Sequence, residues 1–398
     1  MTYLRLMNAE ACIGSRVFGK GKRVISVEVM RPDALDASCI DAWRAMQAAT
    51  PAFANPLLGP EFAIAVGAVR HDAHVAVWRE AGAPVAFLAH HRRPGGFARP
   101  IGAPFSDYCA LISGPGFPLL GLDALESAGI AAMQLDGLAD PYGLFLRVQT
   151  VSEPAYRIRR GDMDAAPALT RNQARNAQRY RRKIERDIGP LRLQAPDHDG
   201  ASFDALMGWK SQQLNASGLH DVLAPVWTRT LMQALFERRA GPLQGLLIML
   251  YAGERPVAGH FGVRASDVYH PWIAALDPEL GAYSPGTLHL RAAIEAMPQM
   301  GLSTYDLGPG SGLWKAHLSN DVLPVRSGLA ATDTPEGRRH AAKDQLWTLP
   351  GLSTLALPAR LHRRLDVIAA SEITTGARLA GVVTAVAGMR RQARRHAG

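Results

Sequence analysis

The chain has 398 residues, of which 47% are hydrophobic and 20% are charged, and its formal net charge is +9. This composition is typical of a folded globular protein and excludes a chain that is disordered throughout. The length predicts two or three domains of ordinary size.

The positive charge is concentrated in three segments. Residues 338–398 carry a net charge of +8, residues 170–187 carry +5, residues 1–31 carry +4, and the remainder is acidic at −8. This distribution disfavours a protein that binds duplex nucleic acid over its whole surface. It is compatible with local contacts to anions.

Cysteine spacing and apolar runs indicate the compartment. Cys12, Cys39 and Cys109 are widely spaced, which argues against a disulfide framework or a zinc site and predicts a reducing compartment and no bound metal. The N-terminus lacks the apolar region of a secretory signal. Leu379–Met389 is about half of the ~20 residues that a spanning helix needs. We therefore expect a cytoplasmic protein that can lie peripherally on the inner face of the membrane.

Hydrophobic periodicity predicts the elements of the first half in order. Residues 1–23 are a flexible leader, 92–105 are a Gly- and Pro-rich loop, and the polar segment 151–167 is a domain boundary. The predicted strands are 24–30, 73–78, 84–90, 108–112 and 143–148, and the predicted helices are 36–49, 56–69 and 122–135.

The second half repeats this order of elements. Its predicted strands are 191–194, 245–251, 256–264, 268–274 and 304–307, and its predicted helices are 170–188, 203–215, 225–239 and 287–297. The repeat predicts two α+β domains with mixed β-sheets and flanking helices, over residues 24–165 and 166–330. Residues 331–398 form a basic tail with predicted helices over 359–370 and 377–395.

Two neighbouring segments carry the chemical signals. Tyr283-Ser284-Pro285-Gly286-Thr287 opens a helix, whose first N–H groups can bind an anion; the alternative is a well-capped helix and nothing more. Asp306-Leu307-Gly308-Pro309-Gly310 is a glycine-rich loop after a strand, which lets a ligand approach the backbone. It has neither the dinucleotide nor the Walker spacing.

A series of segments carries a family resemblance. In order they are RNQARNAQRYRRKIERDIG, WKSQQLNASGLHDVLAPVW, GERPVAGHFGV, AALDPELGAYSPGTLHLRAAIEAMPQMG and YDLGPGSGLWKAHLS. The series resembles the GNAT-type acyltransferase domain of the CelD or BioF2-like group of exopolysaccharide biosynthesis proteins. That group is similar to the Fem peptidyltransferases, which carry two GNAT folds in tandem. The resemblance covers about residues 168–320 and extends more weakly to the first half.

The resemblance implies tandem GNAT-like domains, with acetyl-CoA or another acyl-CoA as co-substrate. The acceptor would be an amino sugar that is nucleotide-linked, lipid-linked or polymeric. Tyr283, Ser284, Gly286 and Thr287 would hold the pyrophosphate and pantetheine of the donor. The glycine loop of simple GNAT enzymes is absent.

Four residues are candidates for catalysis. By resemblance Lys315 lines the transfer site, although Trp314 stands where the family has tyrosine. A lysine can stabilise an oxyanion or, with a lowered pKa, move a proton. Asp306 is either a base or a loop cap. His260 and His270, on adjacent predicted strands, are either general bases or structural groups.

The candidates for substrate binding lie in several segments. The arginines of the Arg-rich helix recur at spacings of three and four, so they lie on one face of the helix. This face is either solvated or binds phosphate. Trp272 either stacks on a sugar or packs in the core. The residues assigned to substrate binding are Arg171, Arg175, Arg182, Lys210, Asp107, Tyr108 and Trp272.

The basic tail allows three interpretations. A basic amphipathic helix can lie on an anionic membrane surface, Arg363-x-x-Asp366 fits a loose cyclic-dinucleotide pattern, or the tail is simply solvated. The leading functional hypothesis is an acyl-CoA-dependent N-acyltransferase acting on an amino sugar of an exopolysaccharide or its precursor. The alternatives are an aminoacyl-tRNA-dependent Fem-type transferase and a non-catalytic GNAT-like protein that binds a nucleotide signal or a membrane through its tail.

Overall fold

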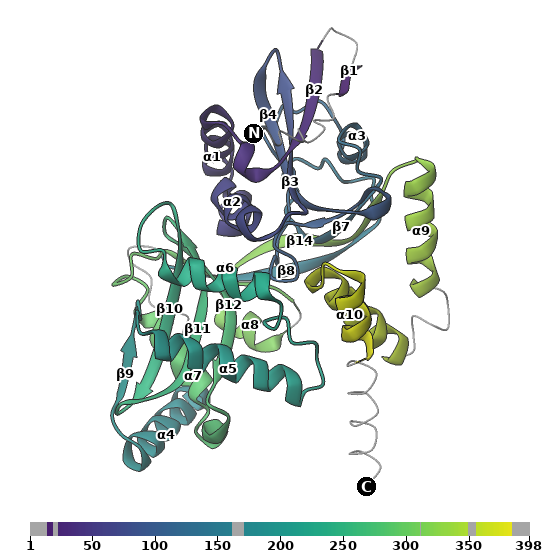
Figure 1. Cartoon of the computed structure of the whole chain (residues 1–398). Helices are drawn as coiled ribbons and strands as arrows, with labels where there is room; N and C mark the ends of the chain where they lie inside the picture. The colour runs from purple at the N-terminus through teal and green to yellow at the C-terminus, as the bar shows by residue number, and fades with distance from the viewer. Residues whose placement is uncertain (1–13, 19–22, 161–170, 311, 349–355, 384–398) are drawn as a thin grey trace, which may run out of the picture.

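The computed structural model describes residues 14–18, 23–160, 171–310, 312–348 and 356–383. Two α/β halves lie one above the other and meet in the middle of the molecule (Figure 1). Among the described residues, no helix is long and apolar enough to cross a membrane.

The first half begins with a hairpin and two helices. Asp36 caps the first helix by accepting a hydrogen bond from the Cys39 N–H (2.8 Å), and that helix buries Cys39 and Trp43. The elements are β1 (Gly14–Phe18), β2 (Arg23–Met30), α1 (Ala37–Ala49), α2 (Pro60–Val69), β3 (Ala73–Glu80), β4 (Ala83–Arg93), β5 (Phe97–Pro100), β6 (Ile112–Ser113), α3 (Gly121–Ser127), β7 (Ala132–Leu138) and β8 (Thr150–Arg159).

The second half contains a similar series. Its elements are α4 (Arg171–Asp187), β9 (Leu191–Gln194), α5 (Gly200–Ala216), α6 (Val226–Glu237), β10 (Leu243–Ala252), β11 (Arg255–Ala265), β12 (Val268–Leu276), α7 (Pro285–Glu295), β13 (Thr304–Pro309), α8 (Leu313–Leu318) and β14 (Asp321–Ala331). The chain then forms α9 (Pro335–Thr348), α10 (Ala356–Ser371) and a further helix over residues 375–383.

A single mixed sheet of 14 strands runs through both halves. Its order is β1-β2-β3-β4-β5-β7-β14-β8-β13-β12-β11-β10-β9, and β6 pairs with β4 beside this path. Apolar residues of both halves pack into one core. The ring centroids of Phe105 and Trp227 lie 6.1 Å apart in an edge-on contact, and those of Phe62 and Trp272 lie 5.6 Å apart. The sheet and its flanking helices are the predicted α+β architecture of the GNAT type, repeated in tandem.

The two halves exchange strands at their junction. β14 pairs antiparallel with β7, from Arg326↔Leu138 to Ala331↔Ala132, and on its other side with β8. β8 precedes the predicted boundary at residues 165/166, yet it lies between β14 and β13 of the second half. The sheet therefore does not divide at that boundary.

Some predicted elements of the first half are wrong. The helix expected over 122–135 ends at Ser127, because Gly129 turns the chain with φ +70° and residues 132–138 then enter the sheet as β7. The segment 151–167, expected to be irregular, contains most of β8. The loop expected over 92–105 contains β5. In the predicted leader 1–23, Gly14–Phe18 forms β1, while residues 1–13 and 19–22 lie outside the described residues.

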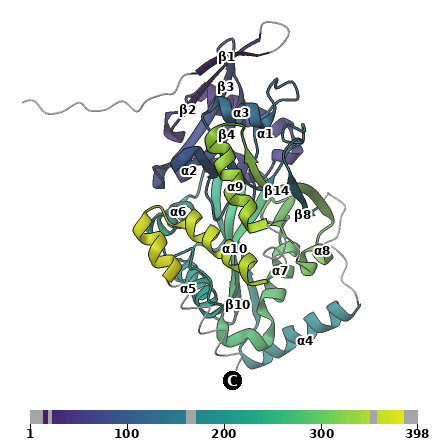
Figure 2. The same cartoon turned by 90° about the vertical axis from the view of Figure 1, so that its right-hand side faces the viewer.

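The predicted basic tail is largely built into the fold. α9 and α10 follow one side of the molecule, and α10 lies at the junction of the halves (Figure 2). The last carbonyls of α10 accept hydrogen bonds from both halves: Ala369 O from Arg93 Nη2 (3.1 Å), Ala370 O from Arg70 Nη1 (3.4 Å) and Ser371 O from Trp227 Nε1 (2.9 Å). These donors bond carbonyl groups that the end of a helix leaves unpaired. The two arginine side chains also interact favourably with the negative C-terminal end of the helix dipole.

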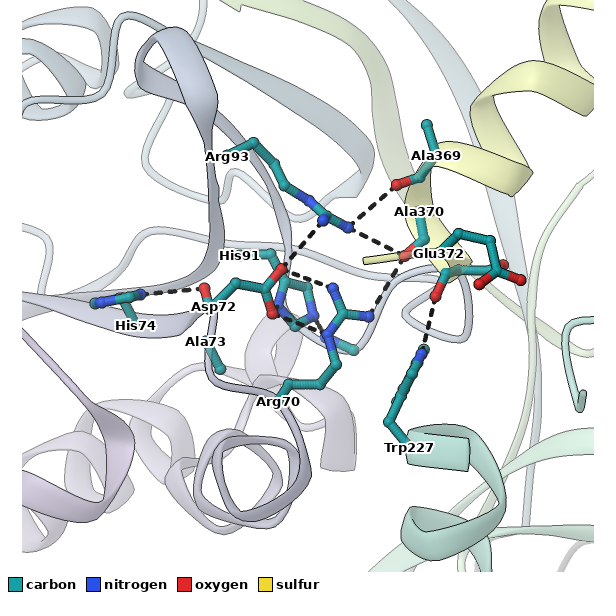
Figure 3. Close-up of polar contacts among 12 residues, drawn as sticks. Arg70, Asp72, Ala73, His74, His91, Arg93, Trp227, Ala369, Ala370 and Glu372 are labelled. Atoms are coloured by element: carbon teal, nitrogen blue, oxygen red, sulfur yellow. Dashed lines mark hydrogen bonds and ion pairs between the residues drawn. The ribbon is translucent and has the colours of Figure 1, made fainter. Parts of the chain in front are cut away.

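Asp72 holds those arginines in place (Figure 3). Its carboxylate accepts two hydrogen bonds from Arg70 (2.8 and 2.7 Å) and lies 3.3 Å from Arg93 Nη1. It also contacts His91 Nδ1 at 3.1 Å, while His91 Nε2 accepts the Gly102 N–H (2.9 Å). Burial opposes the charge of Asp72, but these bonds hold its pKa well below the usual range.

Replacing Asp72 tests this buried ion cluster. In Asp72→Asn, two buried guanidinium groups lose their counter-charge, so we expect the free energy of unfolding to fall by about 3–5 kcal/mol. Urea denaturation at pH 7 measures it. Asp33→Asn, at an exposed aspartate, should change stability by no more than about 0.5 kcal/mol. Equal effects of the two variants would contradict the structural role of Asp72.

Candidate active site

The candidate site lies where two parallel strands separate. β12 and β13 pair only at Val268↔Thr304 and Tyr269↔Tyr305. The next residues of the two strands are His270 and Asp306, and the ladder between the strands does not continue past them. Parted strands leave backbone N–H and C=O groups that need other partners, so this opening in the sheet is suited to a ligand.

His270 sits between two carboxylates. Its Nε2 lies 3.2 Å from Asp107 Oδ2, and its Nδ1 lies 3.8 Å from Asp306 Oδ1. His270 and Asp306 are buried, whereas the side chain of Asp107 is 50% exposed. Asp107 is therefore the member of this trio that a substrate in solvent can reach.

The first half also holds Asp306 in place. Tyr108 donates its hydroxyl to Asp306 Oδ1 (2.7 Å), and Asn55 Nδ2 donates to Oδ2 (2.9 Å). The Gly308 N–H donates to the same carboxylate (2.8 Å). Each oxygen of this buried carboxylate thus has a donor, and donors from both halves meet on it.

The electrostatics keep His270 charged. Burial disfavours its cation, but hydrogen bonds and attraction from Asp107 and Asp306 outweigh that cost and raise its pKa to about 9. Burial also opposes the charge of Asp306, and its bonds to His270, Tyr108 and Asn55 nevertheless lower its pKa. Burial and the neighbouring Asp306 raise the pKa of Tyr108 far above its usual value, so Tyr108 remains a donor.

Lys315 extends the charged cluster from α8. Its Nζ donates to the Pro309 carbonyl (2.8 Å), and partial burial lowers its pKa, against the attraction of Asp107 and Asp306. Its neighbour Trp314 is 52% exposed. Lys315 itself is half-buried, and its ammonium group lies within the field of both carboxylates.

Two glycines allow this close approach. A Cβ at Gly137 would lie 2.0 Å from the Asp107 carbonyl oxygen. Gly308 has φ +73°, and a Cβ there would lie 3.0 Å from Asp107 Oδ2. Any larger residue at these positions would push the Asp107 loop away from the cluster.

His260 lies on the opposite face of the sheet from the other candidates. Its Nδ1 bonds the Tyr305 hydroxyl (2.6 Å), and its ring lies 4.3 Å from that of His289. Tyr305 and Asp306 are consecutive on a strand and point to opposite faces. Burial lowers the pKa of His260. The structure therefore separates His260 from His270, Asp306 and Lys315.

The helix start predicted to bind an anion adjoins the Arg-rich helix. Ser284 has φ +48° and precedes Pro285, the first residue of α7. α4 buries Ala177 and Ile184 in a cluster with Leu280 and Leu288. This packing brings basic side chains of α4 to the start of α7.

Tyr283 connects the two helices directly. Lys183 Nζ lies 4.6 Å from the centre of the Tyr283 ring, and the Tyr283 hydroxyl donates to Asp187 Oδ2 (3.3 Å). The predicted residues Tyr283, Ser284, Gly286 and Thr287 thus lie at a helix N-terminus that has Lys183 and Asp187 of α4 beside it.

The remaining predicted contacts are dispersed. Arg175 and Arg182 are exposed on α4, and the side chain of Arg171 is outside the described part of the chain. Lys210, on α5, donates to the Ala274 carbonyl of β12 (3.5 Å). Trp272 packs against Phe62 and Phe105 at the junction of the halves, which favours the core-packing interpretation.

Sequence reasoning missed Asn55. An Asn-Pro pair reads as a local turn, and its Oδ1 does accept the Leu57 N–H (2.9 Å). Its amide nitrogen, however, contacts His270 and Asp306, which lie more than 200 positions away in the sequence. No pattern in the sequence near Asn55 predicts these contacts. Within the described residues, no group of histidine, cysteine and acidic side chains could hold a metal ion.

Comparison with known proteins identifies the second half. Residues 171–316 match the family described as the acetyltransferase (GNAT) domain, and no curated protein sequence matches the chain. A structure of the C-terminal domain of a putative lysylphosphatidylglycerol synthetase from Agrobacterium fabrum aligns with a TM-score of 0.48 and 10% identity. The alignment covers 79% of this chain and 97% of that one.

Two further solved structures align at similar identity. FemX has a TM-score of 0.47 and 10% identity, with coverage of 76% of this chain and 96% of that one. A tandem GNAT protein from the clavulanic acid biosynthesis pathway has a TM-score of 0.42 and 11% identity, with coverage of 77% and 98%. Residues 171–316, which include His270 and Asp306, thus carry a GNAT-type acetyltransferase domain, and this domain supports an acyltransferase activity.

The charge state of His270 provides a direct test of the cluster. Because Asp107 contributes the first of the interactions that raise its pKa, we expect Asp107→Asn to lower the pKa of His270 from about 9. Histidine NMR over a pH series measures the shift. Asp123→Asn, at an exposed position on α3, should leave the titration unchanged. A His270 pKa that is unaffected by Asp107→Asn would contradict the arrangement.

Proposed function

We propose that the chain is an acyl-CoA-dependent N-acyltransferase, in the first instance an N-acetyltransferase, acting on an amino sugar of an exopolysaccharide or its precursor. The observation that carries this proposal is the buried cluster at the parting of β12 and β13, in which Asp107, His270 and Asp306 lie in a row beside Lys315. The resemblance of residues 168–320 to exopolysaccharide biosynthesis domains supports an amino sugar as acceptor.

The residues present suit an acyl-CoA donor. Its diphosphate needs cations and N–H donors, and the start of α7 offers both, with Lys183 beside Tyr283. Among the described residues, a Cβ at Gly286 would meet Leu276 alone (3.5 Å), so neighbouring side chains do not crowd the backbone there. When bound, the donor supplies a thioester, which is activated toward attack by an amine.

Asp107 is the residue that meets the acceptor. Its half-exposed carboxylate can bind the ammonium form of an amino sugar and take a proton from the nitrogen as the N–C bond forms. His270 does not reach solvent. Its cation and the buried carboxylate of Asp306 fix the position of Asp107, so both act as positioning residues.

Lys315 completes the transfer. Its ammonium group can stabilise the negative oxygen of the tetrahedral intermediate. As the C–S bond breaks, it can donate a proton to the departing thiolate, and its lowered pKa favours that donation. The ammonium group first loses one proton to solvent, which frees the lone pair for attack. The attacking amine then loses its second proton to Asp107 while the thiolate gains one from Lys315, and proton exchange with solvent returns both side chains to their starting states, so the step balances.

One observation weighs against an aminoacyl-tRNA donor. Fem-type enzymes often carry a long helical arm within the second domain. Here α6 ends at Glu237 and β10 begins at Leu243, so only residues 238–242 connect them. An acyl-CoA donor therefore remains the better proposal.

Variants of the two accessible groups test the chemistry. We expect Asp107→Asn and Lys315→Met each to reduce kcat roughly 10²–10⁴-fold, measured by thiol release from acetyl-CoA with amino-sugar acceptors. His317→Gln, an exposed neighbour on α8, should retain full activity. Calorimetry with coenzyme A should show that both inactive variants still bind it. Full activity in Asp107→Asn, or no binding of coenzyme A by the wild type, would overturn the proposal.

Variants of α4 test its part in donor binding. Loss of a charge-assisted contact costs about 1.5–3 kcal/mol, so Lys183→Ala should raise the KM for acyl-CoA roughly 10–100-fold while kcat stays near that of the wild type. Arg181→Ala is the matched control, because Arg181 pairs with Glu185 (2.9 Å) on the same helix. A KM that increases equally in both variants would show a general charge effect rather than a contact at the start of α7.

A further inference from the structure

The first half contains a second opening in the sheet. β5 and β7 run parallel and pair only at Phe97↔Ala132 and Ala98↔Met133. The second half shows the same pattern, in which two paired positions precede His270 and Asp306. In the first half the corresponding next residues are Arg99 and Gln134.

A cavity of about 320 Å³ lies at this opening, and both Arg99 and Gln134 line it. α9 and α10 close its other side with Lys343, Trp347 and Asp366. Its volume lies at the lower end of the ~300–1,000 Å³ range of small-molecule sites. The internal repeat thus places a cavity in the first half at the position that the active site occupies in the second.

The charges of this cavity differ from those of the active site. Arg93, Arg99, Lys343 and Arg378 line it, whereas Asp344 and Asp366 are its only carboxylates among the lining residues described. Arg99 is 7% exposed and donates to Asp366 Oδ1 (2.6 Å). The remaining excess of positive charge favours an anion.

Arg93 supplies a donor that lacks an acceptor. The residue is 8% exposed; Nη1 contacts Asp72 and Nη2 donates to Ala369 and Ala370. Its Nε is buried and has no hydrogen-bond partner in the described part of the chain. Because this Nε is closed to solvent, an occupant of the cavity would meet the guanidinium charge of Arg93 rather than accept a hydrogen bond from Nε.

We propose that this cavity is a second ligand site, which binds a small phosphate-bearing anion. The fork of donors on arginine matches the oxygens of phosphate. The site is built from β5 and β7 of the first half and α9 and α10 of the C-terminal segment, so an occupant would bind the C-terminal helices to the first half. It is independent of the donor site at α7.

Binding is tested on the full-length protein by calorimetry and by the fluorescence of Trp347, which lines the cavity and stacks on His362 (4.7 Å). The ligands are pyrophosphate, AMP and coenzyme A, with sulfate as the reference at constant ionic strength. We expect saturable binding of a phosphate compound at least tenfold tighter than that of sulfate. Comparison of the three ligands separates a free phosphate source from a nucleotide or coenzyme source.

Matched variants assign the binding to this cavity. Lys343→Glu should weaken it at least tenfold, whereas Arg339→Glu, exposed on the same helix and outside the cavity, should not. Trp347→Phe should remove the fluorescence change and keep the calorimetric signal. Lys183→Ala should leave this binding intact, which distinguishes it from the donor site. Absence of saturable phosphate binding, or equal weakening by Lys343→Glu and Arg339→Glu, would overturn the proposal.

Discussion

The pairing of β14 with both β7 and β8 is the constraint on which the rest of the structure depends. It makes one sheet of two α/β halves, so neither half can rotate without breaking a ladder. The contact of 3.2 Å between Asp107 and His270 joins residues from different halves and needs that rigidity. A loose linker between two domains would not hold a buried imidazole between two carboxylates, since an unpaired charge there would be expensive.

Each half has an opening between two parallel strands, and the two openings carry side chains of opposite charge. In the second half, the residues after the last strand pair are His270 and Asp306, and the nearby carboxylates favour an ammonium substrate. In the first half they are Arg99 and Gln134, and the surrounding arginines favour an anion. One backbone geometry thus presents two chemistries, because the side chains that follow the paired residues decide the local field.

The fold shows where the basic segments behind the net charge of +9 lie. The sequence predicts that the basic C-terminal segment binds a membrane or a nucleotide signal, and this stays a prediction. In the structure, the end of α10 in this segment is held by Arg70, Arg93 and Trp227. Asp366, the acidic residue of the RxxD pattern, pairs with Arg99 of β5. The basic charges of α4 lie beside the start of α7, where a phosphate group is expected.

Sequence alone predicted the order of elements in the second half and, through a family resemblance, the GNAT-type fold. It also named as candidates five residues that the structure brings together, which are Asp107, Tyr108, His270, Asp306 and Lys315. The elements follow from hydrophobic periodicity, whereas the fold type and the role of Lys315 follow from the resemblance of short segments to a known family. Only the tertiary structure decided that β8 and β14 cross between halves, that Asn55 bonds Asp306, that His260 faces away and that the tail closes a cavity. Those outcomes depend on contacts between residues far apart in the chain, whose free energy comes from burial and pairing in the folded state and leaves no periodic mark in the sequence.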